Sequence, residues 1–271
     1  MTHRAPARGA AARDVVEAVR SRARAVVRAS GIRRPPFAPE RYGAGCGVAA
    51  IVTAALDGGP VRLERPAGAQ GGARLLVDRR LPPHTPQWNG AVAVGLAEML
   101  APPGIVGEAR RALVEVAAAE LLLPMAVFRP RALRTDLTMD GLRDLAARFA
   151  APLRLAARQW LSTGLWQGYA LLWRADDGVL RLRWRAASGR RFPPALALGA
   201  DAAGVWAPAS RLFATHRTGR PHHGVEEVQT GTGTAWWFTR FGAVRGHAEP
   251  AASRAVFAMV MLAGISSGSS K

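Results

Sequence analysis

Residues of the types that bind metals gather at only one place in this sequence, around residues 222–227. His222 and His223 are followed by Glu226 and Glu227, and imidazole and carboxylate groups are common zinc ligands. Their spacing matches no established ligand pattern. The surrounding segment, between Gly219 and Gly233, favours a solvated turn. We therefore predict no metal site there.

Cysteine chemistry is confined to Cys46, so the chain can form neither an internal disulfide nor a cysteine zinc cluster. We interpret Cys46 as a small buried hydrophobic residue and His84 as an exposed loop residue. No uninterrupted apolar run approaches the roughly 18 residues of a membrane span. The arginine-rich start also lacks the apolar segment of a signal peptide. We expect a cytoplasmic protein that does not cross a membrane.

Arginine dominates the charge of the chain. There are 37 basic and 19 acidic residues, which gives a formal net charge of +18, and all but one of the basic residues are arginine. Such a charge favours a nucleic acid or another polyanion as a partner. Alanine, glycine and proline are abundant too, so a GC-rich genome accounts for the same bias. DNA binding and general solubility charge both remain open.

Three groups of arginines are candidates for contacts with nucleic acid. The first lies off the apolar stripe of a helix predicted to begin at Asp14, as either a phosphate-contacting or a solvated face: Arg13, Arg20, Arg22, Arg24 and Arg28. The second lies in a predicted helix-turn-helix: Arg143, Arg148, Arg154 and Arg158. The third lies on one face of a predicted hairpin: Arg181, Arg183 and Arg185.

The segment from Glu108 to Thr163 is expected to form three helices, and the second group of arginines lies in the last two of them. Pro124 ends the first helix, Thr138 or Asp140 caps the second, and Pro152 suits the first turn of the third. The apolar periodicity predicts their buried faces. These faces are Leu113, Val114, Ala117, Ala118, Leu121 and Leu122; then Leu142, Leu145, Ala146 and Phe149; then Leu155, Ala156, Gln159 and Trp160.

Two strings in this segment carry a family resemblance. They are A-A-A-E-L-L-L-P, from Ala117 to Pro124, and L-A-A-R-F-A-A-P, from Leu145 to Pro152. They resemble the ImmA/IrrE metallopeptidases, closest to the IrrE (PprI) radiation-response regulators. In that family a preceding helix bears H-E-x-x-H, whose histidines bind zinc and whose glutamate activates the metal-bound water. The helix ending in the first string supplies a further ligand.

The ligands that this resemblance implies are missing. The histidine positions fall on Val92 and Leu96, the general base on Ala93 and the third ligand on Arg111. A zinc site cannot be assembled from these side chains. Glu98, Glu115 and Glu120 remain as acids near the site. We predict that Glu98 pairs with Arg111 and replaces the metal by a salt bridge between the same two helices.

The resemblance and the order of elements imply an α+β fold. The expected parts are a disordered tail (1–12), a zincin-like ImmA/IrrE domain with a small sheet (13–130), a helix-turn-helix-like unit (131–164), a GAF-like α/β domain (165–264) and a flexible tail (265–271). Val48–Leu56 is expected to form either a strand or the buried end of a helix. Expected strands lie at Val61–Leu63, Arg74–Val77, Tyr169–Arg174, Val179–Trp184, Thr234–Phe241 and Ala255–Leu262, with a helix at Ala207–His216.

The function we expect is that of a non-catalytic regulator in a stress or DNA-damage response, which binds a protein such as a transcriptional repressor, or DNA. It needs no cofactor. Two alternatives remain: an active zinc endopeptidase that cleaves a repressor, for which zinc would be the cofactor, and a helix-turn-helix DNA-binding regulator.

Overall fold

The structure, a computed structural model, describes residues 6–65, 72–165, 168–176, 179–188, 211–230, 233–244 and 255–266. The chain divides into two compact units. One comprises Met1–Thr135 and Arg143–Gln159, and the other comprises Asp136–Leu142 and Trp160–Lys271. Helices and antiparallel strands are largely segregated along the chain, which is consistent with the expected α+β class.

The first unit opens with helix α1 (Pro6–Ala29), which is followed by two short 3-10 turns, η1 (Pro39–Tyr42) and η2 (Ala44–Cys46). The start of α1 at Pro6 corrects the prediction of a disordered segment up to residue 12, because alanine and arginine there are strong helix formers. Residues 1–5 of that predicted tail lie outside the described residues. Val19, Ala23 and Val27 form the buried stripe of α1, as its periodicity predicts.

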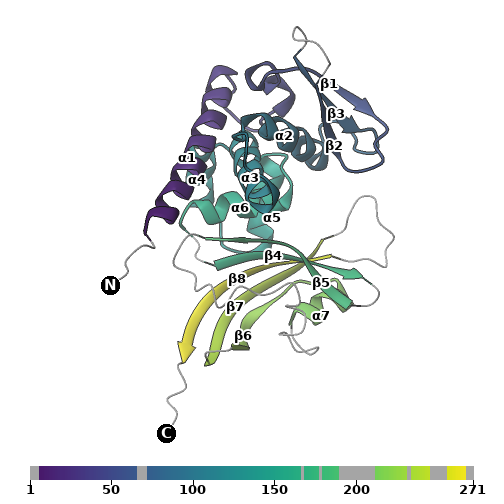
Figure 1. The fold of residues 1–271 in the computed structure, drawn as a ribbon. Coiled ribbons are helices and arrows are strands. Elements are labelled where there is room, and N and C mark those ends of the chain that lie inside the picture. Colours follow the sequence, from purple (N-terminus) through teal and green to yellow (C-terminus); the bar gives the residue numbers. More distant parts are fainter. Residues whose placement is uncertain are drawn as a thin grey trace. The chain divides into compact units, whose positions relative to one another are not determined.

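A three-stranded sheet follows, made of β1 (Val48–Ala54), β2 (Val61–Glu64) and β3 (Ala73–Asp78) in the order β1-β3-β2. β3 is parallel to β1 and antiparallel to β2. Helix α2 (Pro86–Leu100) lies beside this sheet (Figure 1). The approach is close because Gly95 has no side chain: a Cβ there would lie 2.3 Å from a methyl group of Leu75.

Four helices occupy the segment where three were expected. They are α3 (Gly107–Leu122), α4 (Met125–Ala132), α5 (Met139–Arg148) and α6 (Leu153–Ser162). The predicted apolar faces of α3, α5 and α6 are all buried. Thr138 caps α5, since its Oγ1 accepts a hydrogen bond from the backbone N–H of Gly141. The additional helix, α4, starts directly after Pro124 and contains Pro130. The sequence does not predict it, because proline usually interrupts a helix.

The second unit contains a five-stranded antiparallel sheet in the order β5-β4-β8-β7-β6. Its strands are β4 (Gly168–Asp176), β5 (Val179–Ala187), β6 (His222–Thr230), β7 (Gly233–Val244) and β8 (Ala255–Ser266), and α7 (Arg211–Thr218) precedes β6. The central strands β4 and β8 bury Leu171, Trp173 and Phe257. The predicted β4–β5 hairpin is confirmed.

Strand β6 corrects the prediction of a solvated turn between Gly219 and Gly233. His222 pairs with Phe241 of β7, and the ladder continues to Thr230 opposite Gly233. The sequence pattern does not predict this strand, because the segment has few large apolar residues and begins with two histidines and a glycine. Of the predicted C-terminal tail, residues 265 and 266 end β8 and residues 267–271 lie outside the described residues.

In the part of the chain that the structure describes, no helix combines the length and the apolar character needed to span a membrane.

Candidate functional site

Helix α2 carries the positions where the family resemblance implies metal chemistry. Thr85 caps the helix, with its Oγ1 accepting a hydrogen bond from Trp88 N–H, and Pro86 occupies its first turn. Val92, Ala93 and Leu96 each have an exposed fraction of 0%. The apolar groups at these positions offer no donor atom, so the residues present do not fit zinc. In the described ranges, no three His, Cys, Asp or Glu side chains lie close enough together to hold a metal ion.

An ion pair does join α2 to α3, but Glu98 pairs with Arg110 and not with the predicted Arg111. The Nη2 and Nε atoms of Arg110 lie 2.7 Å and 2.8 Å from Oε2 of Glu98. The same guanidinium donates to the carbonyl oxygens of Glu98 (3.0 Å) and Pro102 (3.2 Å). Arg111 is exposed. Because successive helical residues differ by about 100° around the axis, only one of the two arginines can face α2.

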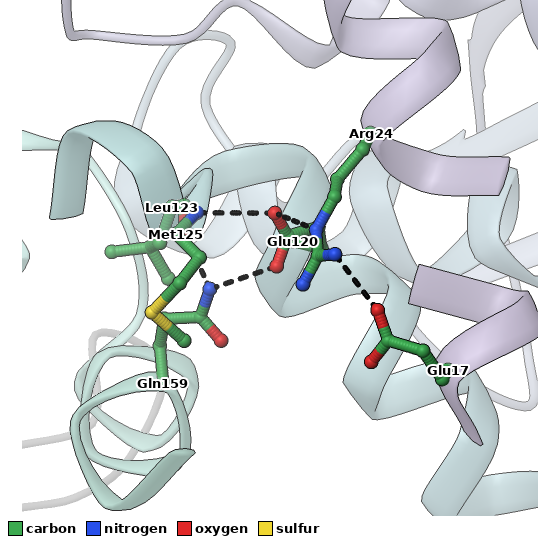
Figure 2. Close-up of polar contacts among 6 residues, drawn as sticks. All are labelled: Glu17, Arg24, Glu120, Leu123, Met125 and Gln159. Atoms are coloured by element: carbon green, nitrogen blue, oxygen red, sulfur yellow. Dashed lines mark hydrogen bonds and ion pairs between the residues drawn. The ribbon is translucent and has the colours of Figure 1, made fainter. Parts of the chain in front are cut away.

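A buried carboxylate on α3 is hydrogen-bonded to three other helices of the first unit (Figure 2). Glu120, near the end of α3, has an exposed fraction of 1%. Its Oε1 accepts hydrogen bonds from Arg24 Nε of α1 (3.3 Å) and from the backbone N–H of Met125 at the start of α4 (3.1 Å). Its Oε2 accepts from Gln159 Nε2 of α6 (3.2 Å). A buried charge is tolerated only when it is paired and hydrogen-bonded, as Glu120 is.

The partners of Glu120 are themselves held in place. Arg24 Nη1 also lies 2.8 Å from Oε1 of Glu17, so that α1 supplies both members of this second ion pair (Figure 2). Gln159 Nε2 donates to the carbonyl oxygen of Leu123 (2.7 Å), one of the groups left unpaired at the end of α3. The apolar periodicity predicts that Gln159 is buried, but nothing in the sequence connects Gln159 or Glu120 with Arg24, which is far from both along the chain.

A pocket of about 390 Å³ lies beside this network, within the first unit. It is bounded by the C-terminal part of α1, the segment that follows it and the start of α4. Its charged lining residues are Arg24, Arg28, Arg33 and Glu120, and its apolar ones are Val27, Ile32, Phe37, Pro124, Met125, Ala126 and Val127. Two arginines of α1, Arg24 and Arg28, therefore line a pocket. The helical periodicity predicts only that they lie off the apolar stripe.

The predicted helix-turn-helix arginines differ in their surroundings. Arg158 on α6 lies 2.6 Å from Oε2 of Glu115 and donates to the carbonyl oxygen of Ala112. Burial lowers the pKa of its guanidinium, which Glu115 partly opposes. Arg148 and Arg154 are exposed, and Arg143 is partly exposed. Six of the ten residues of α6 are buried, so this helix offers a nucleic acid only a narrow surface.

The hairpin arginines all lie on the exposed side of an edge strand. Arg181, Arg183 and Arg185 are exposed on β5, and Trp184 between them is half-buried with its ring 6.0 Å from that of Phe257. Arg174 of β4 is also exposed and stands directly opposite Arg181.

The two remaining candidate groups have the expected surroundings. The His84 side chain is 75% exposed, with Nδ1 3.6 Å from Oε1 of Glu40 and its ring 5.5 Å from that of Trp88. Cys46 is buried, and burial raises the pKa of its thiol to about 11. A thiol of this kind is not a nucleophile at neutral pH.

The fold has counterparts among solved structures. One of them is titled "Mycobacterium tuberculosis transcriptional regulator", with 17% sequence identity and a TM-score of 0.54 over 90% of this chain and 76% of that one. At this identity the likeness concerns the fold alone. No protein-family profile and no curated protein matches the sequence.

Proposed function

We propose that this chain is a non-catalytic regulator, with a first unit of the ImmA/IrrE metallopeptidase type that works by binding and not by hydrolysis. The complete burial of Val92, Ala93 and Leu96 carries the proposal. Zinc catalysis needs nitrogen, oxygen or sulfur ligands and an open coordination position for water. An apolar helix packed on a sheet supplies neither of these.

The pair between Glu98 and Arg110 supports the same view. A structural metal holds together the elements that ligate it, and here a charge-assisted hydrogen bond joins α2 to α3 instead. Likeness in fold to a structure titled as a transcriptional regulator agrees with a regulatory role. The proposed partner is a protein such as a transcriptional repressor.

Metal analysis of the purified chain tests this proposal against an active zinc endopeptidase. We expect less than stoichiometric zinc after dialysis, and an unfolding temperature that neither added zinc nor a chelator changes. A ligand that binds the folded state at a hundred times its Kd stabilises that state by about 2.7 kcal/mol, so bound zinc would be visible in the melting curve. One zinc ion per chain that survives dialysis would overturn the proposal.

DNA binding is the second candidate, and the β4–β5 hairpin favours it more than the helix-turn-helix does. Arg181, Arg183 and Arg185 are all exposed and spaced along one strand, whereas six of the ten residues of α6 are buried. Removal of one arginine that binds a phosphate should reduce the slope of log K against log salt by about 0.9 for duplex DNA. The measurement is fluorescence anisotropy with a labelled duplex over a range of salt concentrations.

Two charge-matched variants separate the two routes. Gln substitutions at Arg181, Arg183 and Arg185 should weaken duplex binding and flatten its salt dependence. The same substitution at Arg143, Arg148 and Arg154 should leave both nearly unchanged. The reverse result would assign binding to the helix-turn-helix, and equal losses from both variants would indicate general charge attraction.

A further inference from the structure

The pocket beside Glu120 has an excess of positive charge at its rim. Within the described residues, the Arg24 side chain pairs with Glu120 and Glu17, while the side chains of Arg28 and Arg33 have no hydrogen-bonding or ionic partner. Arg28 and Arg33 are exposed. Two guanidinium groups therefore border one concavity, available for a ligand that carries negative charge.

Glu120 does not reverse this preference. Both of its oxygens accept hydrogen bonds from the protein, and its charge is matched by Arg24. A cationic ligand would have to displace one of these donors and approach the guanidinium groups of Arg28 and Arg33 as well. The charges that line the pocket therefore favour an anionic ligand over a cationic one.

The rest of the lining is apolar. Val27 and Phe37 are buried, and Ile32, Met125 and Val127 are partly exposed around them. An inorganic anion would leave this surface in water, whereas an apolar chain or ring would cover it. The volume of about 390 Å³ lies at the small end of the range for small-molecule sites.

We propose that this pocket binds a small amphipathic monoanion, a carboxylate on an aliphatic body, with the carboxylate at Arg28 and Arg33 and the apolar body over Val27, Phe37 and Met125. The site would give the chain a response to a metabolite. It does not depend on the presence or absence of zinc, nor on DNA binding.

Isothermal titration of the full chain with octanoate tests the proposal, with 1-octanol and acetate as matched comparisons. For a ligand of this size we expect a Kd on the order of 0.1 mM. Octanol, which lacks the charge, and acetate, which lacks the chain, should each bind at least about tenfold more weakly. Equal binding of octanol or of acetate would overturn the proposal.

Variants at exposed positions test where octanoate binds, and they are not expected to unfold the protein. Arg28→Gln together with Arg33→Gln should weaken octanoate binding at least about tenfold, because the charge-assisted hydrogen bonds to the carboxylate can no longer form. Arg34→Gln together with Arg41→Gln removes the same charge from exposed residues that do not line the pocket, and should leave the affinity unchanged.

A third variant tests the apolar part of the pocket. Ala126 is exposed and lines the pocket, so Ala126→Trp should fill the space and abolish octanoate binding while the circular dichroism spectrum stays the same. Octanoate binding that survives both Ala126→Trp and the Arg28/Arg33 substitution would place the ligand elsewhere and overturn the assignment.

Discussion

Arg24 Nε and Glu120 Oε1 lie 3.3 Å apart although their residues are separated by 96 positions in the sequence. This ion pair fixes α1 against the end of α3, and the same carboxylate reaches the first backbone N–H of α4 and the side chain of Gln159 in α6. One buried side chain thus connects four helices.

Removal of the Glu120 carboxylate should destabilise the first unit strongly. Glu120→Ala leaves the Met125 N–H without its acceptor and Arg24 without its buried partner, which should cost roughly 3 kcal/mol in the free energy of unfolding. Glu17→Ala is the control, because it removes the other, exposed partner of Arg24 and should cost less than about 1 kcal/mol. Urea denaturation followed by circular dichroism measures both, and equal losses would contradict the central role of Glu120.

Glu98 and Arg110 should be energetically coupled, whereas Glu98 and Arg111 should not. Both members of the observed pair are partly exposed, so a double-mutant cycle of Glu98→Gln and Arg110→Gln should give a coupling energy of about 0.5–1 kcal/mol. The parallel cycle with Arg111→Gln should give a value near zero. A larger coupling to Arg111 would restore the pairing expected from the sequence.

Gly95→Ala should weaken the packing of α2 on the sheet despite the better helix propensity of alanine. The added Cβ would lie 2.3 Å from Leu75 Cδ1 and 2.9 Å from Val61 Cγ2, and overpacking of this kind costs about 1–3 kcal/mol. Gly58→Ala is the matched control, because a Cβ there meets no atom within 4 Å. The midpoint of chemical denaturation should fall for Gly95→Ala and stay close to wild type for Gly58→Ala.

Cys46 should resist thiol reagents in the folded protein. Burial raises the pKa of its thiol to about 11, so at pH 8 the thiolate fraction, and with it the rate of labelling by Ellman's reagent, should be roughly two hundredfold lower than in urea. The raised pKa stabilises the folded state below the ordinary thiol pKa of about 8.5. This contribution is lost as the pH rises toward about 11. Rapid labelling of the native chain would show that Cys46 is accessible.

Apolar periodicity is enough to predict most of the helices from α1 to α6. The apolar stripes of α1, α3, α5 and α6 repeat with the helical period, and their residues are buried as expected. Helix α4 was missed because Pro124 and Pro130 read as helix breakers, although proline at a helix start is well tolerated. Strand β6 was missed because its stability depends on pairing with β7 and not on its own composition.

The candidate sites were harder to predict, since each depends on distant residues that meet only in the folded chain. The sequence predicts correctly that Glu98 pairs with an arginine of α3. Whether this is Arg110 or Arg111 depends on how α3 is rotated about its axis, which the sequence does not show. Arg28, Arg33 and Met125 gather around one pocket only after α1 and α4 have packed. A one-dimensional charge count cannot distinguish such a pocket from a solvated helix face.

The fully enclosed positions of α2 also bear on how such a protein can evolve. Histidines at positions 92 and 96 would be completely buried. They would lie on a helix that packs closely against Leu75 because Gly95 has no side chain. A metal site at these positions would require a rearrangement of the helix and the sheet, since each change alone leaves buried polar rings or a cavity. Substitutions that introduce such ligands one at a time are therefore expected to destabilise the first unit before any zinc site exists.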